Sequence, residues 1–278
     1  MLKHILFLAL VICTRMGYGQ EMTVMSYNIK YDNVNDTVNN WNNRKQAMAR
    51  LIKHYNPQVF GTQEALYHQT TYLDSSITSY AYVGIGRDDG TQKGEYTAIH
   101  YDSTKLKILA TDTFWLSKTP DKVSVGWDAA LERICTYALF QNSITKNRFY
   151  VFNTHFDHIG KTARAKAAQL IISKIRELNT QKLPCILMGD LNLTPDEAPI
   201  MYLSKQLNDG REVSKKPPYG PLGTFNGFDW NAVLDKRIDY IFVDGFKVES
   251  YTHIDDRMEN NKHISDHLPV IAMLSFTP

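Results

Sequence analysis

The chain has 278 residues, of which 43% are hydrophobic and 22% are charged, and this composition excludes a disordered or low-complexity protein. Its 31 basic and 29 acidic residues nearly balance, so the chain lacks the excess positive charge of proteins that bind polyanions generally. We find no linker or internal repeat, and the length then predicts one large domain.

The first 20 residues have the pattern of a secretory signal peptide. A basic n-region precedes a short apolar run over residues 5–13, and residues 17–19 offer small side chains for cleavage. We expect cleavage near residue 19 or 20 and a secreted or periplasmic domain over residues 21–278. Loss of Lys3 and Arg15 leaves 29 basic against 29 acidic residues. No other stretch is apolar enough to cross a bilayer, so we expect no stable membrane insertion.

Short apolar runs that end in polar residues predict strands along the rest of the chain, and two segments with apolar residues every three or four positions predict helices. The expected strands cover residues 23–28, 59–64, 149–155, 185–192, 237–243 and 267–274, and the expected helices cover residues 44–55 and 162–178. Strands interspersed with helices predict a sheet-based α/β domain with helical cover.

The stretch CILMGDLNLTP, residues 185–195, ends an apolar run with two polar residues. Because side chains alternate along a strand, Asp190 and Asn192 are expected on the same side. Gly189 lets the backbone pass close to a neighbour, and Pro195 prevents the strand from continuing. Two interpretations fit: a functional site at a strand end, or an Asx-type turn in which both side chains bond to nearby backbone amides.

The other expected strands also end in carboxylates, amides or imidazoles, which weakens the interpretation as unrelated turns. These residues are Asn28, Glu64, His155, Asp190 with Asn192, Asp239, and Asp266 with His267. Oxygen ligands from Glu64 and Asp266, with Asn28 beside them, suit Mg²⁺ or Mn²⁺ and suit zinc poorly. Histidines with carboxylate partners suit acid/base catalysis. The combination predicts phosphoryl chemistry.

Seven motifs then identify a family resemblance: MSYNIKYD, PQVFGTQEAL, GEYTAIHY, NTHFDH, GDLNLTPDEAP, RIDYIFV and SDHLPV, in this order over essentially the whole domain. The chain resembles the endonuclease/exonuclease/phosphatase superfamily, and WLSKTP and GWDAALERICTY resemble its secreted bacterial members. The resemblance implies the DNase I-like fold, a two-sheet α/β sandwich with helices on the outer faces and a site where strand ends of both sheets meet. It also implies a Mg²⁺-dependent (or Mn²⁺-dependent) phosphoesterase.

The resemblance assigns roles to the site residues. Glu64 would bind the divalent cation, with Asn28 and Asp266 close to the same site. His267 resembles a general base for the attacking water, held in one tautomer by Asp239.

In the same way, Asp190 and Asn192 would orient the nucleophile and the scissile phosphate, and His155 would donate to a phosphoryl oxygen. Whether Asp190 or His267 takes the proton stays open. Arg133 would contact phosphate or else pair with a neighbouring acid. Glu95 would orient His155 or else be a solvated strand-end carboxylate.

Three further groups have two interpretations each, and a fourth has one. Phe225 either stacks on a substrate group or packs in the core. Asp157 and His158 either line the cleft or belong to an ordinary loop. Cys135 and Cys185 either form a disulfide or, as we expect, are two buried free thiols without metal-ligand spacing. The basic residues Lys161, Arg164 and Lys166 are expected to form a solvated helix face.

The motifs also restrict the substrate. GDLNLTPDEAP and RIDYIFV resemble nuclease and deadenylase-like members, whereas the WCDRIL-type stretch of inositol polyphosphate 5-phosphatases is missing. We therefore expect hydrolysis of a small phosphodiester, such as a nucleotide or an oligonucleotide end, and no protein partner is indicated. The alternatives are a phosphomonoesterase on a sugar or lipid phosphate, or a catalytically idle binding module on the same fold.

Overall fold

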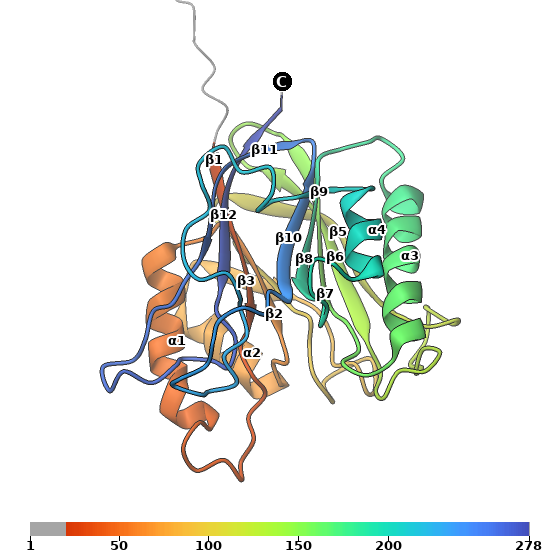
Figure 1. The fold of residues 1–278 in the computed structure, drawn as a ribbon. Helices are drawn as coiled ribbons and strands as arrows, with labels where there is room; N and C mark the ends of the chain where they lie inside the picture. The colour runs from red at the N-terminus through yellow and green to blue at the C-terminus, as the bar shows by residue number, and fades with distance from the viewer. Residues whose placement is uncertain (1–20, 278) are drawn as a thin grey trace, which may run out of the picture.

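The computed structural model describes residues 21–277, so the signal peptide expected in residues 1–20 lies outside the described residues. Sixteen elements follow one another along this part of the chain (Figure 1). They are β1 (Glu21–Asn28), α1 (Trp41–Tyr55), β2 (Val59–Gln63), α2 (Tyr67–Ser76), β3 (Tyr80–Val83), β4 (Ile99–Asp102), β5 (Leu106–Trp115), β6 (Ile134–Asn142), β7 (Arg148–His155), α3 (Lys161–Leu178), β8 (Cys185–Asp190), α4 (Ala198–Ser204), β9 (Asn208–Asp209), β10 (Asp239–Asp244), β11 (Phe246–His253) and β12 (Val270–Phe276).

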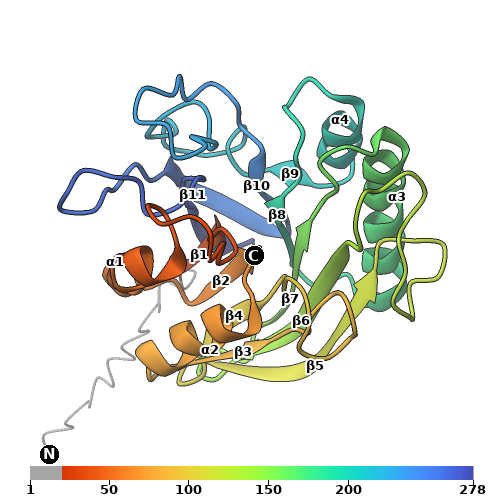
Figure 2. The ribbon, with the colours of Figure 1, turned by 90° about the horizontal axis from the view of Figure 1, so that it is seen from below.

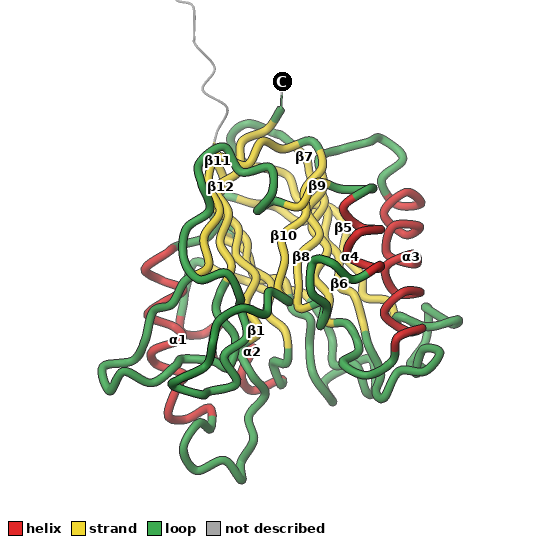
Figure 3. The backbone as a smooth tube through the Cα atoms, viewed as in Figure 1, coloured by secondary structure: helices red, strands yellow, loops and turns green. Residues whose placement is uncertain are grey.

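The strands form two six-stranded sheets that pack face to face. Their orders are β11-β12-β1-β2-β4-β3 in the first sheet and β5-β6-β7-β8-β10-β9 in the second. Helices α1 and α2 cover the outer face of the first sheet, and α3 and α4 cover the outer face of the second (Figures 1 and 2). Figure 3 shows the resulting order of layers, with the two strand layers between the helices. The α/β sandwich predicted from the sequence is confirmed.

Three apolar clusters hold these layers together. One lies between the sheets and includes Val24, Val151 and Ile186. The other two lie under the helices, one beneath α1 and α2 and one beneath α3 and α4. All six residues of β8 are buried because this strand is covered on both faces, which explains its continuous apolar sequence. Cys135 and Cys185 are buried free thiols, as expected.

The two predicted helices are present with small changes at their starts. Helix α1 begins at Trp41 rather than at residue 44, because the side chain of Asn40 caps it by accepting from the amide of Asn43 at 3.3 Å.

In α3 the expected solvated basic face is wrong at Arg164. This side chain is buried and donates to the carbonyl oxygen of Asp157 at 3.2 Å, because the first turn of α3 packs on that loop.

The topology carries the predicted polar residues to one edge of the sandwich. Parallel β7 and β8 place His155 beside Asp190, and antiparallel β10 places Asp239 opposite Asp190. In the first sheet, β1 and β2 are parallel and end beside each other, and β12 begins next to the end of β1. Residues after β1, after β2 and before β12 therefore meet those of the second sheet.

No helix within residues 21–277 is long and apolar enough to span a membrane.

Candidate active site

A cavity of about 650 Å³ opens at this edge of the sandwich. Eight of the residues predicted for the site line it: Glu64, Glu95, Arg133, His155, Asp190, Asn192, Asp266 and His267. Asn28 and Asp239 are fully buried and do not line the cavity themselves. Asn28 contacts Glu64 and Asp239 contacts His267, and both of these residues line it. Phe225 and His158 also line the cavity. The structure thus brings together residues that lie up to 239 positions apart in the sequence.

On the side of the first sheet, a lysine joins the two carboxylates expected to bind metal. The ammonium of Lys30 lies 3.2 Å from Glu64 Oε2 and 3.2 Å from Asp266 Oδ2. Burial favours the neutral acid of Glu64, but Lys30 and then His267 outweigh burial and hold its pKa below the ordinary value. Burial alone would likewise lower the pKa of Lys30, yet Glu64 and Asp266 raise it. This side of the cavity is a compact cluster of charged groups.

Asn28 connects the two sides of the site. Its amide nitrogen donates to Glu64 Oε1 at 3.1 Å and to Asp190 Oδ2 at 2.9 Å. Its amide oxygen accepts from the backbone N–H of Lys30 at 3.1 Å. The sequence places Asn28 with the metal ligands. In the structure its amide nitrogen faces the carboxylates and its amide oxygen is bonded to the Lys30 N–H. Asn28 therefore holds Glu64 and Asp190 at a fixed distance from each other.

His267 is held by the carboxylate that the sequence assigns to it. Its Nδ1 lies 2.8 Å from Asp239 Oδ2, and the hydroxyl of Thr224 donates to the same oxygen at 2.6 Å. The ring of Phe225 lies edge-on to the imidazole, with the centroids 5.1 Å apart. Burial opposes the charged imidazolium, but Asp239 and then Asp190 outweigh burial and raise the pKa of His267.

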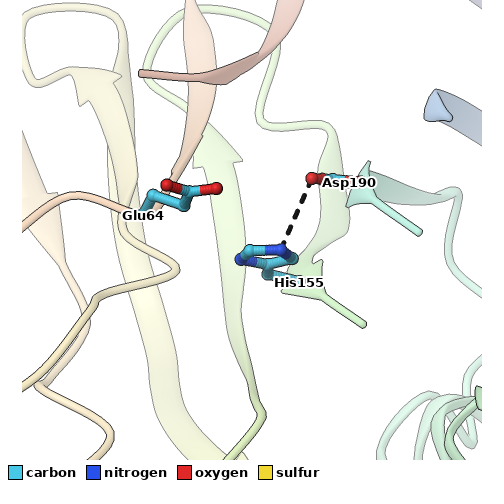
Figure 4. A group of neighbouring side chains, drawn as sticks. All are labelled: Glu64, His155 and Asp190. Atoms are coloured by element: carbon cyan, nitrogen blue, oxygen red, sulfur yellow. Dashed lines mark ion pairs between the residues drawn. The ribbon is translucent and has the colours of Figure 1, made fainter. Parts of the chain in front are cut away.

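On the side of the second sheet, His155, Asp190 and Asn192 contact one another directly. His155 Nε2 lies 3.4 Å from Asp190 Oδ2 and 3.1 Å from Asn192 Nδ2, and Figure 4 shows the imidazole between Asp190 and Glu64. Burial lowers the pKa of His155, and Arg133 and Arg87 lower it further, so the ring is neutral. Burial raises the pKa of Asp190, which makes this carboxylate a stronger base.

Strand alternation is not what brings Asp190 and Asn192 together. Strand β8 ends at Asp190, and Asn192 adopts a left-handed conformation with a φ of 51°. Its backbone N–H donates to Asp190 Oδ1 at 2.9 Å, which is an Asx-type turn. Both interpretations of the sequence are therefore present at once, because the turn is what directs the Asn192 amide to His155.

A buried cluster of charged groups lies behind His155. Both carboxylate oxygens of Glu95 accept from Arg87, at 2.6 and 2.9 Å, and Glu95 Oε2 lies 3.7 Å from His155 Nδ1. Burial raises the pKa of Glu95. Glu95 is thus a partner of Arg87 that also borders His155, rather than a solvated residue.

Arg133 both pairs with a neighbouring acid and lines the cavity, so the structure combines the two alternatives that the sequence leaves open. It pairs with Asp157 at 3.5 Å, contacts His158 Nδ1 at 3.0 Å, and lines the cavity. Its Nη1 is buried and has no hydrogen-bond partner within residues 21–277. Asp157 itself accepts from the backbone amides of Ala130, Ile159 and Gly160 and holds this loop. The guanidinium of Arg133 at the wall of the cavity is suited to bind an anion.

Sequence reasoning missed Lys30, Arg44, Arg87 and Thr224. Lys30 stands two residues after Asn28 in YNIK, so its position at a strand end was a usable signal. Arg44 is fully buried and donates to the carbonyl oxygens of Ile29 at 2.9 Å and Ile264 at 2.8 Å. It thereby joins the loops that carry Lys30 and Asp266, and no local pattern reveals this.

The donor set fits a divalent cation. Glu64 and Asp266 offer carboxylate oxygens on either side of one positive group, the arrangement that Mg²⁺ and Mn²⁺ prefer. Ligand atoms of Glu64, His155 and Asp190 also lie within 4.8 Å of one another, as do those of Asp190, Asp239 and His267. In the second group, His267 and Asp239 already bond to each other. Two arrangements of ligands remain, Glu64 with Asp266 and Glu64 with His155 and Asp190, and Glu64 belongs to both.

Comparison with known proteins agrees with this geometry. The sequence matches the Endonuclease/Exonuclease/phosphatase family over residues 25–267, and the chain therefore belongs to this family of hydrolytic phosphoesterases. An endonuclease/exonuclease/phosphatase family protein from Bacteroides thetaiotaomicron is 38% identical, with a TM-score of 0.89 over 94% of this chain and 99% of that one.

Two further relatives show the range of similarity. A mannosyl-6-phosphatase from Bacteroides thetaiotaomicron is also 38% identical, with a TM-score of 0.87 over 92% of this chain and 100% of that one. An uncharacterized protein from Acanthamoeba polyphaga mimivirus is 27% identical over 256 residues, which cover 85% of this chain and 93% of that protein.

Proposed function

We propose that this protein is a divalent-metal-dependent phosphatase that removes the phosphate group from a small sugar phosphate. The observation that carries the proposal is one cavity that is lined by carboxylates, two imidazoles and an arginine. A phosphate monoester carries about two negative charges near neutral pH. Such a group needs cationic donors on several sides, and Lys30, Arg133 and Lys236 all line this cavity.

Glu64 and Asp266 would hold the metal, in agreement with the use of divalent metals in this family and with the oxygen donors found here. A bound Mg²⁺ or Mn²⁺ would supply Lewis-acid polarisation of the phosphoryl group and of water. Asn28, which donates to Glu64 and Asp190, would keep the metal side at a fixed distance from the base.

Asp190 is the better candidate for the base that takes the proton of the attacking water. Its raised pKa makes it basic, whereas His267 is held as an imidazolium by Asp239. His267 would then stabilise negative charge on the phosphoryl group. Neutral His155 accepts from Asn192 through Nε2, so its one N–H is on Nδ1, on the side of Glu95. Arg133, which lines the cavity, would bind a non-bridging oxygen, and Asn192 would hold His155 in place.

The preference for a sugar monoester rests on the mannosyl-6-phosphatase relative, which this chain matches over nearly its whole length. A small phosphodiester, the substrate expected from the sequence, is the second candidate. It is favoured by the similarity of GDLNLTPDEAP and RIDYIFV to nuclease-type motifs, and these stretches form the Asp190 turn and the Asp239 strand start.

A substrate panel separates these candidates. With Mg²⁺ present, we expect the highest kcat/KM for a hexose 6-phosphate, and values at least about tenfold lower for a nucleoside cyclic phosphodiester and a dinucleotide. The reverse order would reject the sugar phosphatase in favour of a phosphodiesterase. Failure to hydrolyse any phosphoester with Mg²⁺ or Mn²⁺ would support a binding module that retains the fold.

We also propose that the protein is exported, as the N-terminal sequence predicts. Expression of the full gene in a bacterial host should yield a periplasmic or extracellular protein whose first residue is near Gln20 or Glu21. Retention of Met1 on a protein found only in the cytoplasm would reject this proposal.

A further inference from the structure

The Lys30 ammonium lies between the two carboxylates that the proposed function assigns to the metal. Each N–O distance is 3.2 Å, which is the contact of a salt bridge. A divalent cation held by Glu64 and Asp266 would need the carboxylate oxygens that the ammonium now contacts. The ammonium and the metal would therefore compete for these oxygens.

The position of Lys30 is built into the backbone. Lys30 has a φ of 57°, a left-handed conformation that is uncommon for residues other than glycine. Its N–H donates to Asn28 Oδ1 at 3.1 Å, and its carbonyl oxygen accepts from Gln69 at 2.9 Å and from Arg44 at 3.2 Å. With both backbone groups bonded, the side chain is directed at the carboxylates, unlike that of an ordinary surface lysine.

The Lys30 side chain also has a path out of this position. It is 29% exposed, while the side chains of Glu64 and Asp266 are 11% and 6% exposed. The ammonium lies 5.0 Å from the centroid of the Tyr31 ring, at the wall of the cavity. The carboxylates are thus nearly buried, whereas the four-carbon stem of Lys30 can turn toward solvent when another cation replaces its ammonium.

We propose that Lys30 is a built-in counter-ion that occupies the cation position between Glu64 and Asp266 and leaves it when a divalent metal binds. Without metal, the ammonium neutralises one of two buried negative charges and stabilises the fold. With metal, its positive charge opposes binding, so the protein binds metal less tightly than its two carboxylates alone would. This inference rests on the metal dependence of the proposed function.

Calorimetric titration of the whole protein with Mg²⁺ and with Mn²⁺ tests this competition. Lys30→Met removes the charge and retains most of the stem, and we expect metal to bind at least about tenfold more tightly, because a unit charge close to the site no longer opposes it. Lys30→Arg retains the charge and should bind within about threefold of the parent protein. Lys236→Met is the matched control, since Lys236 is exposed, lines the same cavity and forms no ion pair within residues 21–277.

Thermal unfolding provides a second readout that does not depend on activity. In metal-free buffer, Lys30→Met should have a lower Tm than the parent, and saturating Mg²⁺ should raise its Tm by more than that of the parent. Lys30→Gln, purified in Mg²⁺ and then dialysed, repeats the measurement with a shorter polar side chain.

The outcomes separate the inference from the proposed function. Equal or weaker metal binding by Lys30→Met, with clear binding by the parent, would overturn the role of Lys30 and leave a metal-dependent phosphatase intact. If neither protein bound Mg²⁺ or Mn²⁺, the metal-dependent function would fail, and the proposed competition with it.

Discussion

The two sheets contribute unlike halves of one site. In the half from the second sheet, His155, Asp190 and Asn192 contact one another directly, and their positions are fixed by a strand register and an Asx turn. In the half from the first sheet, the ammonium of Lys30 lies between the carboxylates of Glu64 and Asp266. One half is joined by direct contacts between its site residues, and the other has between its carboxylates a cation that another cation can replace.

This difference indicates a division of labour. The directly bonded half contains the groups to which the proposed function assigns proton transfer and the binding of phosphoryl oxygens, and these roles need fixed geometry. The half held by a cation contains the groups that would exchange one cation for another. His267 and Asp239 join the halves, because His267 precedes β12 of the first sheet while Asp239 begins β10 of the second. Each half then has its own test.

Removal of the metal should give the largest effect, because the half from the first sheet would then hold no Lewis acid. Exhaustive chelation should abolish turnover, and added Mg²⁺ or Mn²⁺ should restore it, since Lys30 cannot supply Lewis-acid polarisation. The measurement is kcat in excess EDTA after metal removal, with metal content determined independently. Full turnover under these conditions would show that the carboxylate half does not bind a catalytic metal.

Substitution in the directly bonded half should give the next largest effect. Asp190→Asn and His267→Ala should each lower kcat by at least about a hundredfold, because proton transfer and positioned charge are each worth that much. Asp244→Asn is the matched control for Asp190→Asn, since Asp244 is exposed and lies at the far end of the same β8–β10 ladder.

The Tm of each variant shows whether the fold is intact. We expect small changes, because Asp190 and His267 lie at strand ends rather than inside an apolar cluster. A folded variant with near-normal kcat would remove that residue from the mechanism, and Asp190→Asn with full activity would return the role of base to His267.

The contrast between the halves also explains what the sequence could predict. Strand ends with polar residues are local patterns, so Glu64, His155, Asp190 and Asp266 were identified and do meet at one edge of the sandwich. The two-sheet fold is what the resemblance of the ordered motifs to the family implies.

Contacts between distant segments have no such local pattern. Neither the bridge made by Lys30 nor the bonds of Arg44 to two separate loops follow from spacing, because they depend on how β1 and the segment before β12 are packed. The left-handed conformations of Lys30, Glu64 and Asn192 are equally hidden, since the surrounding hydrogen bonds impose them.

Substitution of Arg133 tests whether this residue binds the substrate beside the directly bonded half of the site. Arg133→Met should raise KM for the preferred phosphate ester by about tenfold or more and change kcat less, because a charge-assisted hydrogen bond to phosphate is lost. Arg148→Met is the control, since Arg148 begins β7 at the opposite end from His155 and bonds to Gln181. An unchanged KM would show that Arg133 does not bind the substrate.

The smallest expected effect is that of salt, and it tests whether recognition is confined to the cavity. A protein that grips a long nucleic acid neutralises many phosphates, and its affinity then falls steeply with salt as counterions are released. Residues 21–278 contain 29 basic and 29 acidic residues. Of the basic pair Lys215 and Lys216, Lys215 is already bonded to Glu249 at 2.8 Å. We therefore expect the protein to recognise one or two phosphates rather than an extended duplex.

We therefore expect kcat/KM for the preferred small substrate, measured against ionic strength at fixed Mg²⁺, to change with a log–log slope shallower than about −2. Long DNA should be a poorer substrate at every salt concentration. A preference for long DNA with a slope steeper than about −4 would indicate several phosphate contacts outside the cavity. The two halves would then form only the centre of a larger, groove-binding surface, and the protein would act as a nuclease.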